Sequence, residues 1–500
     1  MRQVGDVFSD LAKLREQVSQ DGNRIADRWR PQVERTAFVP SVENLANYLA
    51  FRRHDIRPLQ RDLTALGLSS LGRAEAHVMP TLDAVHTVLH ALTEGSPFAR
   101  QDEASFFGGE TRLAERSGEL FGERSPHSPV SLLVTLPSEA ADQPELLQQL
   151  AELGVEAVRI NCAHDDEDVW LRMIENVREA HAETGRRMRV FMDLAGPKIR
   201  TGDTRKGKNG NRVHTGDEFA IALPGQLKKV TKDLPALECT LPEAVRAAEV
   251  GNRISIDDGK LDVRVTRCEA WGIVVAVVAG GGDEKGYKLK SEKGINFPDT
   301  DLDVPALTQT DREHLVFAAH HADAIEFSFV QTRGDILQLQ DALRGERPDD
   351  WQQVGLVLKI ETSRAVKNLP DLIVQAAGQQ PTAVMIARGD LAVQIGFARL
   401  AEIQEEILWL AEAAHVPVIW ATQVLESFLK TGVPSRGEMT DAAMGARAEC
   451  VMLNKGPHLL KAIPELDKLF GRMSEHMSKK TPQLRALQSW DAFAREHGAA

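Results

Sequence analysis

The sequence predicts an α/β protein, because short apolar segments typical of β-strands alternate with amphipathic helical segments from about residue 130 to residue 470. Eight strand-plus-helix units follow one another in this part of the chain, and eight is the number that closes a (β/α)8 TIM barrel. Charged residues stand where several of these strands end. In parallel α/β proteins that edge of the sheet is where ligands bind, so the pattern that predicts the fold also locates the chemistry.

Length and composition indicate a globular protein of several domains. Five hundred residues are more than one hydrophobic core usually holds. The content of 42% hydrophobic and 27% charged residues is typical of globular proteins. The net charge of −13 argues against a nucleic-acid-binding protein. The four cysteines have no CxxC spacing, and neither a signal-peptide core nor a run of about 18 apolar residues occurs. We therefore expect reduced thiols, a cytoplasmic location and no membrane insertion.

Residues 1–128 are predicted to form a helical N-terminal region and a linker. Up to about residue 95, apolar residues recur at spacings of three and four. Between residues 96 and 129 the composition turns polar, and Gly108, Gly109 and Pro129 are breakers, so we expect the linker there. The predicted helical segments are 8–20, 42–54 and 82–95.

The barrel is predicted from residues 129–202 and 298–470. Its candidate strands are apolar runs, and a segment with helical period follows nearly all of them. The eight candidate strands are 130–136, 157–163, 188–196, 324–330, 354–361, 383–390, 416–423 and 450–456.

An insert at residues 203–297 interrupts the barrel after its third strand. It is rich in glycine and in strand-like runs, with one short helical pattern at 241–250, so we expect a small all-β domain. At the catalytic end of a barrel such a domain is well placed to act as a lid. Residues 471–500 are expected to form a polar, partly helical C-terminal tail.

The fifth and sixth predicted strands end in the most informative residues. Lys359 and Glu361 end the fifth, and Gly389 and Asp390 end the sixth. A lysine between two carboxylates at this edge suits a divalent cation and a phosphorylated anion, and Gly389 lets backbone N–H groups approach an anion. The alternative is an ion pair that only closes a layer of the barrel.

The second and third predicted strands also end in polar residues, which are expected to meet Thr422 of the seventh at the barrel mouth. Phosphoryl transfer needs cations around the transferred group and carboxylates for a metal, and this set supplies both. Plainer interpretations are that Arg159 simply pairs with Asp193 and that His164 is a polar residue at a helix start. The set is Arg159, Asn161, His164, Asp193, Lys198 and Arg200.

These residues resemble those of the pyruvate kinase family, over residues from about 130 to 465. The matching stretches occur in the family's order and on the expected elements, including the β insert. They read VRINCAH, MDLAGPKIRTG, ISIDDG, KGINFPD, DVPALTQTD, SFVQTRGDI, LKIET, VMIARGDLAVQI, VPVIWATQVLESF, PSRGEMTDAA and CVML. The chain is similar to a short form of the family, with a helical N-terminal extension and without the C-terminal regulatory domain.

The resemblance implies a divalent-metal site and a set of residues around the substrates. Glu361 and Asp390 resemble the carboxylates that bind Mg²⁺, or Mn²⁺, shared with phosphoenolpyruvate. Lys359 resembles the lysine that contacts the transferring phosphoryl group and assists proton transfer to the enolate. Thr422 resembles the threonine near the methyl-forming carbon, and Asp257 belongs to the acidic motif of the lid. The expected catalytic residues are Lys359, Arg159, Thr422 and Lys198. The expected substrate- or nucleotide-binding residues are Arg159, Arg200, Asn161, His164, Gly389, Asp390, Thr422 and Asp257.

Departures from the family pattern concern a monovalent cation and proton delivery. Ala163 stands where many members have serine, and Lys198 stands where potassium-dependent members have glutamate. Asn161 and Asp193 would then be a vestigial monovalent-cation site, with the ammonium of Lys198 supplying the charge, so we expect K⁺ not to be required. The alternative is that Lys198 is an exposed surface lysine. Residues 454–457 replace the usual SGETA motif.

The resemblance implies transfer of the phosphoryl group of phosphoenolpyruvate to ADP, giving pyruvate and ATP in glycolysis. Two alternatives stay open: a Mg²⁺-dependent lyase or aldolase acting on a pyruvate enolate, and a non-catalytic regulatory protein of the same fold. The expected partners are phosphoenolpyruvate, ADP, ATP and pyruvate, and neither nucleic acid nor a membrane. The sequence leaves formation of a homo-oligomer open.

Overall fold

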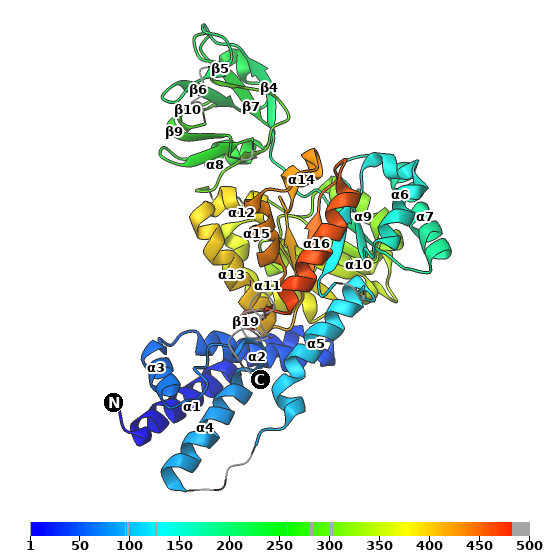
Figure 1. Ribbon diagram of the computed structural model, residues 1–500. Coiled ribbons are helices and arrows are strands. Elements are labelled where there is room, and N and C mark those ends of the chain that lie inside the picture. The colour runs from blue at the N-terminus through cyan, green and yellow to red at the C-terminus, as the bar shows by residue number, and fades with distance from the viewer. Residues whose placement is uncertain are drawn as a thin grey trace, which may run out of the picture.

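A computed structural model describes residues 2–482, apart from residues 96, 98, 99, 126, 127, 258, 281–284, 301 and 303. An all-β domain, a central barrel and a group of N-terminal helices lie one above another in Figure 1. Within the described part of the chain, no helix has both the length and the apolar character needed to cross a membrane.

The centre of the molecule is a closed barrel of eight parallel strands. The strands are β1 (Ser131–Thr135), β2 (Ala157–Asn161), β3 (Arg189–Leu194), β13 (Ala324–Phe327), β14 (Gly355–Ile360), β15 (Thr382–Ala387), β16 (Val418–Ala421) and β17 (Cys450–Leu453). They pair in the order β1, β17, β16, β15, β14, β13, β3, β2, which confirms the predicted (β/α)8 fold. Asn161 lies opposite Asp193, and Asp193 lies opposite Glu326, so the ends of β2, β3 and β13 are level.

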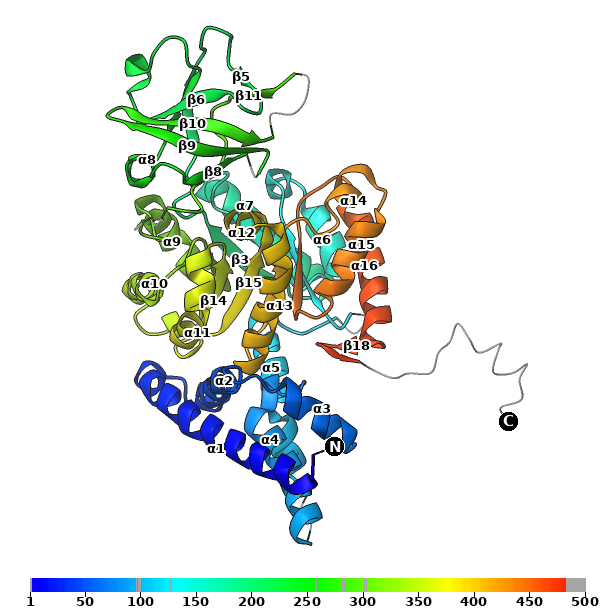
Figure 2. The same ribbon diagram turned by 90° about the vertical axis from the view of Figure 1, so that its left-hand side faces the viewer.

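Helices surround the barrel (Figure 2). They are α6 (Pro144–Glu152), α7 (Glu167–Thr184), α9 (Gln309–His321), α10 (Arg333–Glu346), α11 (Ser363–Ala377), α12 (Arg388–Ile395), α13 (Phe397–Ala413), α14 (Glu426–Thr431), α15 (Arg436–Gly445) and α16 (Leu459–Ser474). The sequence predicts one strand over 383–390, but β15 ends at Ala387 and α12 begins at Arg388. The error arises because an apolar run shows where a strand starts better than where it turns into a helix.

The N-terminal helices confirm the predicted helical region. They are α1 (Val4–Trp29), α2 (Val39–Phe51), α3 (Arg57–Ala65) and α4 (Val78–Glu94). Helix α1 buries Val7, Leu11, Leu14 and Val18, which recur at spacings of three and four, and it packs against α2 and α4.

The expected linker contains a long helix, α5 (Glu103–Phe121), which corrects the prediction. Gly109 does not break this helix; it lets α5 approach a neighbouring segment, since a Cβ there would collide with the carbonyl oxygen of Ala76. At the end of α5, Leu120 and Phe121 enter the apolar cluster inside the barrel, where the Phe121 ring stacks on Phe191 at 5.9 Å between centroids. Helix α5 therefore closes the N-terminal end of the barrel.

The insert is an all-β domain with a core of its own, which includes Phe219, Ile256 and Val263. It leaves the barrel at the C-terminal end of β3 and lies above that end in Figures 1 and 2. Its main sheet has the order β12, β8, β9, β10, β6, β7, β4, and β5 pairs with β11. The elements are β4 (Thr201–Arg205), β5 (Arg212–Val213), β6 (Glu218–Ala222), β7 (Ala236–Cys239), α8 (Pro242–Ala247), β8 (Arg253–Ile256), β9 (Leu261–Glu269), β10 (Gly272–Ala279), β11 (Tyr287–Lys288) and β12 (Ile295–Asn296).

The start of the expected C-terminal tail continues helix α16 to Ser474. The short strands β18 (Met477–Ser478) and β19 (Thr481–Pro482) follow and pair with each other. The rest of the expected tail, residues 483–500, lies outside the described residues.

Candidate functional site

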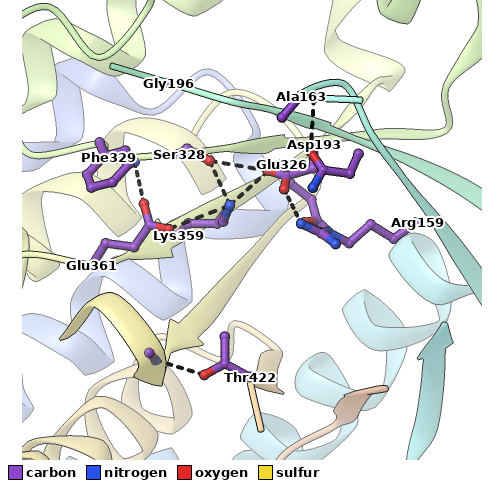
Figure 3. Close-up of polar contacts among 12 residues, drawn as sticks. Arg159, Ala163, Asp193, Gly196, Glu326, Ser328, Phe329, Lys359, Glu361 and Thr422 are labelled. Atoms are coloured by element: carbon purple, nitrogen blue, oxygen red, sulfur yellow. Dashed lines mark hydrogen bonds and ion pairs between the residues drawn. The ribbon is translucent and has the colours of Figure 1, made fainter. Parts of the chain in front are cut away.

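Four strands bring ionisable side chains together inside the C-terminal end of the barrel (Figure 3). Arg159 comes from β2, Asp193 from β3, Glu326 from β13 and Lys359 from β14. Glu326 is fully buried, and the other three expose at most 9% of their surface. Charges this deeply buried are tolerated only when they are paired and hydrogen-bonded, and each of these four has an oppositely charged partner within the cluster.

Three groups hold the ammonium of Lys359. Its Nζ donates to Asp193 Oδ1 at 2.9 Å and to Ser328 Oγ at 2.6 Å, and it lies 3.5 Å from Glu361 Oε1. Burial alone would lower the pKa of Lys359, but the negative charges of Asp193 and Glu361 outweigh burial and raise the pKa above its ordinary value. Lys359 is therefore a fixed cation at the barrel mouth.

Arg159 is clamped between two carboxylates. Its Nε donates to Glu326 Oε2 at 3.0 Å, its Nη1 donates to Thr135 Oγ1 at 3.1 Å, and its Nη2 donates to Asp193. Asp193 thus pairs with Arg159 as well as with Lys359. The plainer interpretation of Arg159, an ion pair with Asp193, is present in the structure, and it also fixes where the guanidinium lies.

Glu326 and Ser328 belong to this cluster and were missed by sequence reasoning. Glu326 Oε1 is buried without a hydrogen-bond partner among the described residues. Burial, opposed by Arg159, raises the pKa of Glu326 to about 7. The signal was a carboxylate inside the apolar segment 324–330, because a charge in a buried strand requires a buried partner.

Glu361 and Asp390 form a carboxylate pair beside Lys359. Glu361 follows β14, and its Oε2 accepts the N–H of Phe329 at 2.6 Å; Asp390 lies in the first turn of α12. Burial, opposed by Lys359 and assisted by the charge of Asp390, raises the pKa of Glu361 to about 7. Two carboxylates that disfavour each other's ionisation are a donor set that a divalent cation would relieve.

A divalent cation at this pair would need ligands from outside the protein. Among the described residues, no group of three or more His, Cys, Asp or Glu side chains is placed to hold a metal ion. Mg²⁺ commonly binds through one or two carboxylates and completes its shell with substrate oxygens and water. Glu361 and Asp390 therefore fit a cation that is shared with a bound anion.

The loop after β16 has a strained backbone at the barrel mouth. Thr422, Gln423 and Leu425 have positive φ values of 64°, 55° and 50°, and such residues cost of order 1–3 kcal/mol each. Arg388 donates to the carbonyl oxygen of Thr422 at 2.6 Å, and the Thr422 hydroxyl accepts the N–H of Gly389 at 2.8 Å. The structure thus joins two predicted site residues, Thr422 and Gly389, and fixes the threonine by its surroundings.

Gly389 is not required by packing against the protein. A Cβ at this position would lie 3.8 Å from its nearest neighbour, the Thr422 hydroxyl oxygen, which is an ordinary van der Waals distance. A side chain at this position would therefore touch Thr422 without a clash, and the role of Gly389 in admitting an anion stays a prediction.

Two predicted site residues, Arg200 and Asp257, contact residues of the all-β domain and not the charged cluster of the barrel. Arg200 donates through Nη1 to the carbonyl oxygen of Glu292 at 3.2 Å. Asp257 accepts the Tyr287 hydroxyl at 3.1 Å and lies 3.2 Å from Lys293 Nζ. Both side chains are engaged within the all-β domain in this arrangement.

Lys198 is exposed in the cleft between the barrel and the all-β domain, where it lines a cavity of about 420 Å³. One Asp193 oxygen accepts from Arg159 and the other accepts from Lys359. Within the described part of the chain, no hydrogen bond or ion pair joins Lys198 to Asp193. The ammonium that we expect to supply the charge of a monovalent cation is therefore not bound to Asp193 here, although Lys198 and Asp390 line the same cavity.

Asn161 and His164 lie on the other side of the mouth, in a cavity of about 320 Å³ that Arg159 also lines. Asn161 Oδ1 accepts the N–H of Ala163 at 3.0 Å, and His164 is exposed. Lys455, from the segment that replaces the expected SGETA motif, lines the same cavity. The structure therefore brings Arg159, Asn161 and His164 together.

Comparisons with known proteins identify the family of the barrel. The family model described as the barrel domain of pyruvate kinase matches residues 129–457. The pyruvate kinase of Geobacillus stearothermophilus is 31% identical over 307 residues, which cover 61% of this chain and 49% of that protein. For the pyruvate kinase of Thermotoga maritima the values are 28% over 359 residues, covering 69% and 71%. For that of Methylorubrum extorquens they are 33% over 321 residues, covering 63% and 62%. The chain thus spans about half of the first relative's length and more of the other two.

Proposed function

The chain belongs to the pyruvate kinase family, and from that premise we propose that it transfers the phosphoryl group of phosphoenolpyruvate to ADP, giving pyruvate and ATP as a step of glycolysis. The observation that carries the proposal is the position of Lys359, a buried ammonium 3.5 Å from Glu361 at the barrel mouth. A fixed cation beside a pair of metal-binding carboxylates suits a reaction in which negative charge moves between a phosphoryl group and an enolate.

Glu361 and Asp390 would hold Mg²⁺ or Mn²⁺. When bound, the cation would offset the negative charge of the phosphate and of the enolate. The N–H of Phe329 fixes Glu361 Oε2, while Oε1 lies on the side of Lys359. These contacts would hold Glu361 in place for the cation.

Arg159 and Lys359 would bind the oxygens of the transferring phosphoryl group. Both cations are already held by Asp193, so neither has to reorganise when charge develops. Because its pKa is raised, Lys359 acts as a proton-bearing cation that stabilises charge. Thr422, held by the strained loop and by Gly389, is the residue that we place near the carbon that becomes the methyl group.

The cavity of about 320 Å³ is our candidate for the ADP site. Arg159 belongs both to this cavity and to the charged cluster, so a diphosphate bound there would be adjacent to the transferring group. Asn161 and His164 would contact the nucleotide. Arg200 and Asp257 would join the site if the all-β domain closes on the barrel as a lid.

We propose that K⁺ is not required, because the ammonium of Lys198 is available in the cleft that Asp390 also lines. Turnover of the wild type should then be nearly the same with and without K⁺ in tetramethylammonium buffer at saturating Mg²⁺. Lys198→Glu should turn over very slowly without K⁺. Added K⁺ should restore its turnover only in part, because Ala163 lacks a hydroxyl. Strong activation of the wild type by K⁺ would show that Lys198 does not replace the ion.

A coupled assay for pyruvate release tests the function itself. Purified protein should release pyruvate from phosphoenolpyruvate only when both ADP and Mg²⁺ are present. Cleavage or condensation of a pyruvate enolate without nucleotide would favour the lyase class, and no turnover with intact binding would favour a regulatory protein.

A further inference from the structure

A cavity of about 680 Å³ lies at the N-terminal end of the barrel, opposite the proposed active site. Its barrel wall includes Arg189, Asp323 and Gly355, at or beside the first residues of β3, β13 and β14. Its other wall includes Arg35 and Glu119, which belong to the N-terminal helical region. The family match begins at residue 129, so this cavity is formed partly by residues outside the matched part of the chain.

Four arginines line the cavity, in a chain whose net charge is −13. Two of them have a carboxylate each: Arg35 pairs with Glu119 at 2.7 Å, and Arg347 pairs with Asp350. The four arginines are Arg35, Arg187, Arg189 and Arg347.

The other two arginines share a single carboxylate. Arg187 donates one N–H to Asp323 at 2.8 Å, and Arg189 donates one N–H to the same oxygen at 2.9 Å. Asp323 also accepts the backbone N–H of Val190 at 2.8 Å. A guanidinium has five N–H donors, so most of the donor capacity of this pair is not used by Asp323. One positive charge is left over at this wall of the cavity.

We infer that this cavity binds the phosphate group of a small phosphate monoester. The phosphate would take the spare N–H donors of Arg187 and Arg189, since arginine pairs suit phosphate oxygens. Arg35 stands on the opposite wall, so the bound ester would connect the N-terminal helical region to the barrel. The inference rests on this cavity alone and does not require the proposed phosphoryl transfer.

Calorimetric titration of the full chain with glycerol 3-phosphate tests the inference without any turnover. The double variant Arg187→Gln/Arg189→Gln should bind at least about tenfold more weakly, the usual cost of losing hydrogen bonds to charged groups. Arg186→Gln is the matched control, because Arg186 is adjacent in sequence, exposed and outside the cavity lining. Lys359→Met should also keep full affinity, because it alters only the barrel mouth.

A further arm keeps the test decisive. If the double variant does not fold, Arg35→Gln, which acts from the other wall, should weaken binding in its place. Unchanged affinity in the arginine variants, or loss of binding in Lys359→Met, would overturn the inference and assign the bound phosphate to another site.

Discussion

The same strands build both ends of the barrel interior, but opposite kinds of residue fill the two ends. At the start of β3, Phe191 packs against Phe121 of α5 in a cluster of apolar side chains. At the end of β3, Asp193 lies among Arg159 and Lys359, and all three are buried. Apolar contacts stabilise by excluding water, whereas buried ion pairs mainly recover the cost of desolvating their own charges. We therefore expect the apolar cluster at the N-terminal end to carry stability and the C-terminal end to carry chemistry.

The largest effect is expected from Lys359→Met. The variant removes a cation that stabilises developing charge, so kcat should fall about a thousandfold with little change in the KM for phosphoenolpyruvate. Steady-state kinetics, with the exposed Lys461→Met as a control, measure this. A defect confined to KM would mean that Lys359 only anchors the ground state.

The next largest effect is expected at the N-terminal end of the barrel. Phe121→Ala should lower the free energy of unfolding by about 3–5 kcal/mol, because Phe121 is 1% exposed and its loss leaves a cavity. The kcat of the folded variant should be that of the wild type. Denaturant unfolding gives the stability, and Phe107→Ala, 49% exposed on the same helix, should change it little. A loss of kcat in folded Phe121→Ala would break the division between the two ends.

Glu326 is expected to position Arg159 by accepting a hydrogen bond rather than by its negative charge. Glu326→Gln keeps an oxygen for Arg159 Nε, whereas Glu326→Ala removes it. The KM for phosphoenolpyruvate should therefore rise about tenfold in the alanine variant and stay near the wild-type value in the glutamine variant. Equal damage in both variants would show that the negative charge matters instead.

The smallest predicted effect is a pH dependence of metal binding. Because burial and Asp390 raise the pKa of Glu361 to about 7, a cation must displace a proton below that pH. The apparent affinity for Mn²⁺, followed by electron paramagnetic resonance without substrate, should fall about tenfold from pH 8 to pH 6 and be nearly constant above pH 8. In Asp390→Asn the pH at which the affinity begins to fall should be lower. A flat profile through pH 7 would indicate that Glu361 is already ionised.

The sequence predicts the barrel well because burial on both faces makes parallel strands apolar throughout, and it predicts Lys359, Glu361 and Asp390 because such strands end at one edge. The sequence does not predict the role of a residue where that role depends on contacts with residues distant in the chain. A glycine such as Gly109 looks the same in the sequence whether it breaks a helix or lets α5 approach Ala76. Glu326 gains its role only from Arg159, which lies on β2.

Phosphorus nuclear magnetic resonance on the purified wild type tests the central claim most directly. With phosphoenolpyruvate, ADP and Mg²⁺ present, the phosphoenolpyruvate resonance should decline as the γ-phosphate resonance of ATP grows by the same amount. Nothing should change when ADP is omitted. Release of inorganic phosphate in place of ATP, or consumption of phosphoenolpyruvate without ADP, would contradict phosphoryl transfer as the reaction at this barrel mouth.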